Sequence, residues 1–142
     1  MRVKIFGAGS IGNHLAYACR SQNLDVTIYD VDSSALQRTK DDIYPSRYGV
    51  WDKKIKLTNS LESNINFDLI IIGTPPDSHI DIFKSLDLDS LKAVLIEKPL
   101  TFPFDKRLAA LVKINKESKV KSFIGYNHIV SESMVEMGKL LK

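Results

Sequence analysis

Short apolar runs alternate with segments of helical periodicity along the chain. The near-continuous apolar run 67–73 is typical of a parallel strand buried on both faces. Further strands are predicted over residues 3–6, 26–29, 55–57, 93–96 and 120–124. Helices are predicted over residues 13–20, 33–42, around 79–83 and from about 103 to 116. This alternation predicts an α/β fold, a doubly wound parallel sheet with right-handed crossovers and helices on both faces.

Two predicted helices have candidate N-caps. Asp32 or Ser33 is expected to cap the helix over 33–42, and Asp77 or Ser78 the helix around 79–83.

The segment from Ile43 to Lys54 breaks the alternation. It contains Pro45 and Gly49, and we expect an irregular excursion before the short third strand. Its aromatic side chains could form a recognition surface, but a small cluster that packs the loop onto the domain is the favoured interpretation. These aromatic residues are Tyr44, Tyr48 and Trp51.

The carboxyl ends of the predicted strands meet at one edge of the sheet. In open α/β sheets, ligands bind beyond this edge, at the point where the strand order reverses. The residues expected there are Gly7, Asp30, Gly73, Thr74, Glu97, Lys98, Tyr126 and Asn127.

A glycine motif, Gly7-x-Gly9-x-x-Gly12, follows the first predicted strand and opens the first helix. In such a motif Gly7 allows the tight turn, Gly9 lets the backbone approach a pyrophosphate, and Gly12 lets the helix pack on the strand. The pyrophosphate lies at the positive end of the helix. A purely structural turn is the weaker interpretation, because both flanking elements are in place. We therefore expect a Rossmann-type dinucleotide site that includes Gly7, Ala8, Gly9, Ser10, Ile11 and Gly12.

Asp30 lies at the end of the second predicted strand, 18 residues after Gly12. At this spacing an acid accepts hydrogen bonds from the adenosine ribose. A carboxylate there repels a 2′-phosphate, so NAD is favoured over NADP, with Val31 beside it in the site. The alternative is a solvated aspartate at a strand end. Arg38 and Lys40 come late for a phosphate clamp, although a turn could bring either back.

Lys98 is the cation directly at the end of a predicted buried strand on this edge. A lysine partly removed from water there could donate or accept a proton beside a bound nicotinamide. The alternative is a lysine that extends into solvent from an ordinary strand end. Pro99 favours the first interpretation, because a proline holds the preceding residue extended and so fixes its direction.

Length and charge exclude several classes of protein. The 142 residues are enough for one domain but not for two full domains. Twenty basic and 17 acidic residues give a net charge of +3, dispersed along the chain, which argues against nucleic-acid or membrane-surface partners. No apolar run approaches the ~20 residues that span a bilayer, and the first 20 residues do not resemble a signal peptide. We expect a cytoplasmic protein without a metal site.

Four blocks in this order resemble the glucose-fructose oxidoreductase and inositol dehydrogenase (Gfo/Idh/MocA) family. They are the glycine motif, Gly73-Thr74-Pro75-Pro76-Asp77-Ser78-His79, Glu97-Lys98-Pro99-Leu100 and Gly125-Tyr126-Asn127-His128. The last two together are far more specific than the glycine motif.

The resemblance implies a Rossmann domain that binds NAD(P) and places Lys98 near the nicotinamide and the reacting hydroxyl or carbonyl group. It implies cofactor contacts from Gly73, Thr74, Pro75, His79, Glu97, Lys98 and Asn127. His79 matches the family's histidine after the two prolines, and an architectural role is favoured over a catalytic one. The role of His128 stays open. A basic residue often stands in the family at the place of Ile129, so a charged substrate contact there is in doubt.

Family members continue into a second domain that supplies the substrate pocket, a further catalytic group and usually the oligomer interface. We expect residues 1–128 to form the cofactor domain and 129–142 to begin that second domain, which is otherwise missing. The fragment alone is then inactive. The parent enzyme would transfer hydride between NAD and a sugar, cyclitol or related polyhydroxy substrate, and would form an oligomer mostly through the missing domain.

The alternative function is a stand-alone nucleotide-sensing module, similar to the regulatory domains of potassium uptake systems. Such a sensor needs neither the Glu97-Lys98-Pro99 block nor the Tyr126-Asn127 block, so their presence favours the enzyme. A short-chain dehydrogenase is excluded because no tyrosine has a lysine four residues later. Phe6 before the first glycine, where an acid is expected, argues against a methyltransferase.

Overall fold

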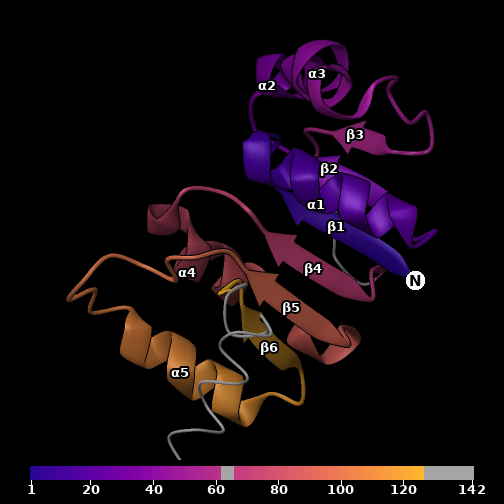
Figure 1. Ribbon diagram of the computed structural model, residues 1–142. Helices are drawn as coiled ribbons and strands as arrows, with labels where there is room; N and C mark the ends of the chain where they lie inside the picture. The colour runs from indigo at the N-terminus through magenta and orange to yellow at the C-terminus, as the bar shows by residue number, and fades with distance from the viewer. Residues whose placement is uncertain (62–65, 127–142) are drawn as a thin grey trace, which may run out of the picture.

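The computed structural model describes residues 1–61 and 66–126, and within them six parallel strands form one sheet in the order β3-β2-β1-β4-β5-β6 (Figure 1). The strands are β1 (Arg2–Phe6), β2 (Asp25–Tyr29), β3 (Lys56–Thr58), β4 (Leu69–Ile72), β5 (Ala93–Ile96) and β6 (Lys121–Ile124). The α-helices are α1 (Ser10–Ser21), α2 (Ser33–Arg38), α3 (Tyr44–Tyr48), α4 (Pro76–Ser85) and α5 (Leu108–Glu117). This arrangement confirms the predicted doubly wound parallel sheet. The strand order reverses between β1 and β4, at the carboxyl end of β1 where the glycine motif begins.

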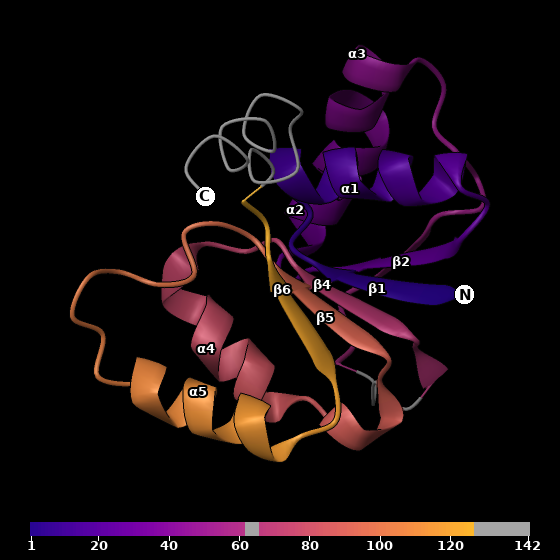
Figure 2. The same cartoon turned by 60° about the horizontal axis from the view of Figure 1, so that its bottom comes forward.

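Helices cover both faces of the sheet, α1 on one side and α4 and α5 on the other (Figure 2). Successive side chains of a strand point to opposite faces, so each strand contributes to two separate apolar clusters. On the α1 side the buried strand residues are Val3, Ile5, Val26, Ile28 and Ile71. On the α4 and α5 side they are Phe6, Tyr29, Ile70, Ile72, Val94 and Ile96. Burial on both faces is the reason that these strands are apolar along nearly their whole length.

Lys4 is a buried cation in the central strand β1, with 1% of its surface exposed. Its ammonium nitrogen lies 5.3 Å from the ring centroids of Phe6 and Tyr29 and 5.5 Å from that of Phe67. At these distances the ammonium group makes cation–π contacts with all three rings. The sequence indicated the strand but contained no sign of this ring cage.

The segment between β2 and β3 corrects the predicted irregular excursion. It is helical through Tyr48, because a π-helical turn η1 (Thr39–Ile43) joins α2 to α3. Pro45 lies in the first turn of α3, where its missing N–H costs nothing, and Gly49 at φ 86° ends that helix. Asp32 caps α2 as expected, because its carboxylate accepts a hydrogen bond from the Ser34 amide.

The aromatic residues of this segment pack it onto α1. Tyr44 is buried and contacts the rings of Tyr48 and Trp51, and Tyr17 of α1 stacks on Tyr48 with ring centroids 4.1 Å apart. The packing interpretation of Tyr44, Tyr48 and Trp51 is thereby confirmed.

Three helices begin at other residues than predicted, and the first of them is α1, which begins at Ser10 instead of Asn13. Helix α4 begins at Pro76, preceded by Pro75, without a side-chain cap from Asp77 or Ser78. Helix α5 begins at Leu108 instead of about Pro103. The Asp105 carboxylate accepts hydrogen bonds from the Thr101 hydroxyl and from the Arg107 amide, and these bonds hold the preceding residues in a turn.

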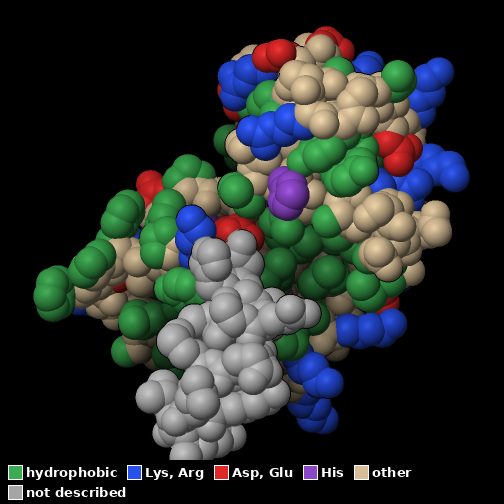
Figure 3. Space-filling model, viewed as in Figure 1, with side chains coloured by type: hydrophobic (Ala, Val, Ile, Leu, Met, Phe, Trp, Pro, Cys, Tyr) green, Lys and Arg blue, Asp and Glu red, His purple; other side chains and the backbone are tan. Residues whose placement is uncertain are grey.

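Lys and Arg side chains are scattered round the rim of the face shown in Figure 3 and do not gather in one patch. No helix within residues 1–61 and 66–126 combines the length and the apolar character needed to cross a membrane.

Asp68 joins the starts of three strands and generates a prediction about acid stability. Its carboxylate accepts a hydrogen bond from the Arg2 amide at 2.8 Å and pairs with the Lys92 ammonium at 2.9 Å. These contacts, the Arg2 bond first, lower the pKa of Asp68 to about 2. A lowered carboxyl pKa adds stability that is present above about pH 4 and is lost between about pH 4 and 2. Urea unfolding should therefore show a smaller loss of stability from pH 5 to pH 3 for Asp68→Asn than for the native chain.

The control for this prediction is Asp89→Asn, at an exposed aspartate of the 3-10 helix η3 (Leu88–Ser90). An Asp68→Asn variant that loses as much stability as the native chain would contradict the assignment.

Candidate dinucleotide-binding site

Three glycines bring the backbones of β1, α1 and β4 into contact at the carboxyl edge of the sheet. Gly7 has a φ of 101°, and a Cβ atom on it would lie 2.9 Å from the Gly73 carbonyl oxygen. A Cβ atom on Gly12 would lie 1.9 Å from the Gly7 carbonyl oxygen. Neither position can hold a larger residue without moving the backbone, so the turn and the helix packing both require glycine.

Gly9 differs from its two neighbours in the motif. A Cβ atom on it would meet no atom within 4 Å, and its φ of −80° is open to any residue. The missing side chain at Gly9 therefore leaves open space above the start of α1 and relieves no contact inside the protein. This is the place through which a pyrophosphate approaches the backbone in dinucleotide sites.

The N-terminus of α1 faces this open space without a side-chain cap. Gly9 is the N-cap residue, no side chain caps the helix, and the first turn contains no acidic residue. The first backbone N–H groups of a helix have no partner within it, and the helix dipole is positive there. Together these features make an anion-binding site.

Two buried polar side chains hold the glycine loop from below. The Asn13 side-chain amide donates to the carbonyl oxygen of Gly9 at 2.9 Å and to the Thr39 hydroxyl oxygen at 3.2 Å. Thr39 donates to the carbonyl oxygen of Ala8. Both side chains are fully buried, so a change at either would leave an unsatisfied group in the interior. The π-helical turn that contains Thr39 thus supports the loop from about 30 residues away in sequence, and no sequence pattern indicated this support.

Asp30 fastens the opposite side of the loop. One carboxylate oxygen accepts from the Ala8 amide at 2.8 Å, and the other accepts from the Asp32 amide at 3.0 Å. Each carboxylate oxygen can accept a further bond. Asp30 is half-buried at the end of β2, so the carboxylate is held in a fixed direction while part of its surface stays open to a ligand.

A cleft of about 820 Å³ runs along this edge between the glycine loop and α4. It is lined by predicted site residues that follow three strands, β1, β2 and β4: Gly7, Gly9, Ser10, Ile11, Asp30, Val31, Gly73, Thr74 and Pro75. Ala8 and Gly12 do not line the cleft, because they act through the backbone contacts described above. The structure thus brings together most of the residues that the sequence assigned to the cofactor.

The predicted catalytic loop lies after β5, beside this cleft. Lys98 is exposed there. The sequence led us to expect a lysine partly removed from water, and the part of the chain that the structure describes does not provide that burial. The Glu97 carboxylate lies against Gly125, where a Cβ atom would come within 2.7 Å of a Glu97 carboxylate oxygen. Asn127 and His128 lie outside the described residues.

His79 does not line the cleft and is fully buried behind it. Its ring nitrogens lie 2.6 Å from the Thr74 carbonyl oxygen and 3.2 Å from that of Leu100. The favoured architectural role fits this position.

Several cleft residues were not predicted from the sequence. They are Phe6, Tyr29, Ala35, Arg38, Leu61, Asp77, Ser78, Asp81, Ile82 and Ser85. Arg38 is brought back to the cleft by α2, one of the two outcomes left open for it, whereas Lys40 does not line the cleft. The signal for the α4 residues was helical spacing after Pro76, since the residues at 78, 81, 82 and 85 share one helix face.

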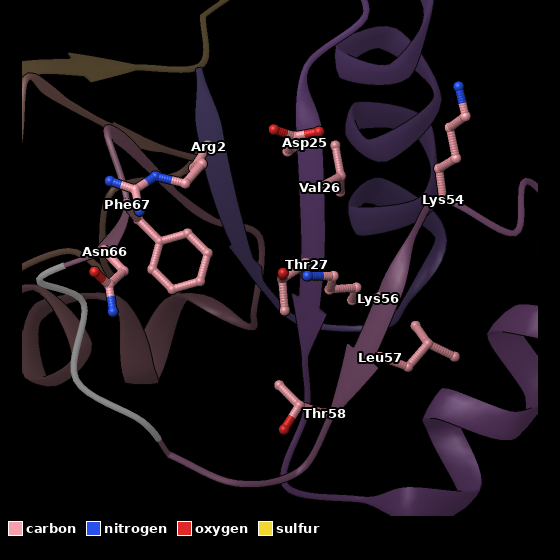
Figure 4. A pocket seen from close by; sticks show the side chains of 10 residues that line it. All are labelled: Arg2, Asp25, Val26, Thr27, Lys54, Lys56, Leu57, Thr58, Asn66 and Phe67. Carbon is pink, nitrogen blue, oxygen red and sulfur yellow. The ribbon is translucent and has the colours of Figure 1, made fainter.

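A second hollow, of about 680 Å³, lies away from the carboxyl edge, on the face of β2 and β3 (Figure 4). Thr27 and Lys56 lie on its floor, Arg2 lies at the amino end of β1, and Phe67 lies in the segment before β4. It contains none of the predicted site residues, and ligands of parallel sheets bind at the opposite ends of the strands. The cleft beside the glycine loop is therefore the candidate site.

The chain belongs to the oxidoreductase family with an NAD-binding Rossmann fold, because the Gfo/Idh/MocA family model matches residues 1–126. Among curated proteins, glycerol-3-phosphate dehydrogenase [NAD(P)+] from Staphylococcus carnosus is 28% identical over 119 residues, which are 79% of this chain and 36% of that protein. The resemblance to the Gfo/Idh/MocA family is thereby confirmed.

Solved structures share the fold. The UDP-N-acetylglucosamine 3-dehydrogenase GnnA from Acidithiobacillus ferrooxidans aligns with a TM-score of 0.75 at 19% identity, over 99% of this chain and 41% of that one. The transcriptional regulator Gal80p from Kluyveromyces lactis aligns with a TM-score of 0.71 at 18% identity, over 99% of this chain and 36% of that one. The chain thus spans well under half the length of these relatives.

The contrast between Gly12 and Gly9 predicts opposite effects on stability. Gly12→Ala forces a Cβ atom onto the Gly7 carbonyl and should lower the free energy of unfolding by about 1–3 kcal/mol or more. Gly9→Ala enters open space and should leave it within about 0.5 kcal/mol. Urea unfolding followed by circular dichroism measures both values. Equal stabilities of the two variants would show that the close contact at Gly12 relaxes easily.

Proposed function

We propose that this chain binds NAD in the cleft and forms the cofactor part of an oxidoreductase that acts on a polyhydroxy substrate. The observation that carries the proposal is the open space at Gly9, above the uncapped start of α1. No packing contact within the described residues requires glycine at this position, so binding is the reason that we assign to it.

The chain's own residues fit each part of the cofactor. The N–H groups at the start of α1 are placed for a pyrophosphate, and the Asp30 carboxylate for the adenosine ribose hydroxyls. Val31, Arg38 and Leu61 line the cleft on the Asp30 side. Gly73, Thr74 and Pro75 line it beyond the glycine loop, toward β5. Glu97 and Asn127 are also included among the proposed cofactor contacts. Because Asp30 is a carboxylate, we favour NAD over NADP.

The chemistry that NAD supplies when bound is transfer of hydride to or from a carbon that bears oxygen. Lys98 follows β5 on the same edge, and its ammonium group is proposed to exchange the proton of the reacting hydroxyl or carbonyl oxygen. Lys98 is exposed in this chain, so the surroundings that remove it from water would come from a substrate domain. This chain spans 36% of the curated relative and 41% of the dehydrogenase structure, so the remaining part of each relative is long enough for such a domain.

The substrate class proposed is a sugar, cyclitol or related polyhydroxy compound. The Glu97-Lys98-Pro99 block and its family resemblance support it, and one solved structure of similar fold is a UDP-N-acetylglucosamine 3-dehydrogenase. We further propose that the parent protein is a cytoplasmic oligomer whose interface lies mostly in the second domain.

Cofactor binding provides the first test of this proposal. The 142-residue chain should bind NAD at least tenfold more tightly than NADP, because the Asp30 carboxylate repels a 2′-phosphate. Two like unit charges about 4 Å apart repel each other by about 1 kcal/mol in bulk water and by about 4 kcal/mol near a protein surface. Titration calorimetry with both cofactors measures the ratio. Gly9→Val should remove the binding, since its side chain fills the space left for the pyrophosphate.

Two controls accompany this titration. Asp30→Asn should narrow the difference in affinity between NAD and NADP, and Lys53→Val, at an exposed position outside the cleft, should not weaken NAD binding. Native-like circular dichroism with unchanged NAD affinity in Gly9→Val would sink the proposal.

The role of Lys98 provides a second test. In a protein that joins this domain to a substrate domain, Lys98→Ala should lower kcat by about 10²- to 10⁴-fold, as expected for loss of a general acid or base. The matched control is Lys106→Ala, at an exposed lysine of the following loop. NAD affinity should stay within a few-fold in both variants. Steady-state NADH formation measures kcat, and a rate indifferent to Lys98→Ala would remove the proposed role.

A regulatory, non-catalytic domain is the second candidate function. It is favoured by the similarity of the fold to a solved transcriptional regulator. Such a domain would bind nucleotide through the same cleft but would not need Lys98. This second function would be favoured if Lys98→Ala binds nucleotide as tightly as the native chain and no substrate screen shows turnover.

A further inference from the structure

His79 connects two loops that leave neighbouring strands of the sheet. It lies in the first turns of α4, on the face that packs against the sheet beside Ile80 and Phe83. Thr74 belongs to the loop after β4, and Leu100 to the loop after β5. The ring thus lies between the loop that lines the cofactor cleft and the loop that contains Lys98.

Each ring nitrogen lies within hydrogen-bond distance of a backbone carbonyl oxygen. The ring nitrogen Nε2 lies 2.6 Å from the Thr74 oxygen and Nδ1 lies 3.2 Å from the Leu100 oxygen. A carbonyl oxygen only accepts, so each contact requires a hydrogen on that nitrogen. The neutral ring has one such N–H and the cationic ring has two. The shorter distance assigns a hydrogen to Nε2 in either form, which makes Thr74 the firmer of the two contacts.

Full burial separates His79 from the chemistry itself. With 0% of its surface exposed, its ring has no open path to a ligand in the cleft. Any influence on cofactor or substrate therefore passes through the two carbonyl groups.

The surface also contains a tie between α4 and the second loop. Arg107 donates to an Asp81 carboxylate oxygen at 2.6 Å and to the Asp77 carbonyl oxygen at 3.1 Å. Such exposed ion pairs contribute little to stability. The histidine is the stronger connection, because its ring is fully buried and a buried N–H without a partner carries a desolvation penalty that an exposed ion pair does not.

We propose that His79 is a positioning residue that holds the Lys98 loop in a fixed place relative to the cofactor loop. The connection itself needs no cofactor. Its consequence for reactivity, that Lys98 is presented at a fixed distance from the cleft, rests on the proposed function. The histidine thus fixes both loops before any ligand binds.

Backbone mobility tests the proposal directly. NMR relaxation of the 142-residue chain measures the order parameters of the Lys98, Leu100 and Thr101 amides, for which about 0.85 means rigid and below about 0.6 means flexible. We expect rigid values in the native chain and flexible values in His79→Phe, which keeps an aromatic ring but has no N–H. His79→Gln retains side-chain N–H donors and should restore part of the order.

Two matched controls separate this effect from loss of stability. Phe83→Leu weakens the core on the same face of α4 and should leave the three order parameters unchanged, as should Lys84→Ala at an exposed position of that helix. Unchanged order in His79→Phe would overturn the proposal. So would an equal loss of order in Phe83→Leu. If His79→Phe does not fold, lower order parameters of the three amides in His79→Gln than in Phe83→Leu would support the proposal.

NAD titration of the same variants distinguishes this proposal from the proposed function. Weaker NAD binding in His79→Phe by about fivefold or more, with native affinity in Phe83→Leu, would support both. No NAD binding by the native chain would overturn the proposed function, while the order parameters would still decide the role of His79.

Discussion

The close approach of three backbone segments at Gly7, Gly12 and Gly73 is the constraint on which the rest of the structure depends. The first turn of α1 touches the carbonyl group that ends β1, and the end of β4 touches the same turn from the other side. The helix, the turn and the neighbouring strand thus lie so close together that no side chain fits between them. As a result the N-terminus of α1 opens at the point where the strand order reverses, so the positive end of the helix faces the cleft.

A loop that consists largely of glycine has little to hold its shape, and the protein supplies that support with polar side chains. Asp30 binds the Ala8 amide from the side of β2, and Asn13 and Thr39 bind the loop's carbonyl groups from below. Each of these groups would cost free energy if it were buried without a partner. The polar groups therefore select one loop conformation. The π-helical turn that follows α2 places the Thr39 hydroxyl under the loop.

The two halves of the sheet contribute different properties to the site. Strands β1 and β2 bring the anion-binding helix start and the carboxylate of Asp30. Strands β4 and β5 bring the lining of Thr74 and Pro75 and the loop of Lys98. Helix α4 lies beside the boundary, with one face in the cleft and its buried face in the core. His79 is on the buried face, so a core residue contacts the backbone of both loops without entering the site.

By itself the sequence determined the fold class, the strands, the glycine turn and about half of the residues that line the cleft, because each depends on local periodicity or on a short motif. Only the tertiary structure decided which distant groups meet: Thr39 under Ala8, the aromatic rings around Lys4, Arg38 at the cleft, and His79 between two carbonyl groups. It also corrected the helix starts, since the side chain of Asp105 forms a turn that competes with the first turn of α5. The exposure of Lys98 was likewise decided by the tertiary structure, because burial depends on what packs around a residue and not on its neighbours in sequence.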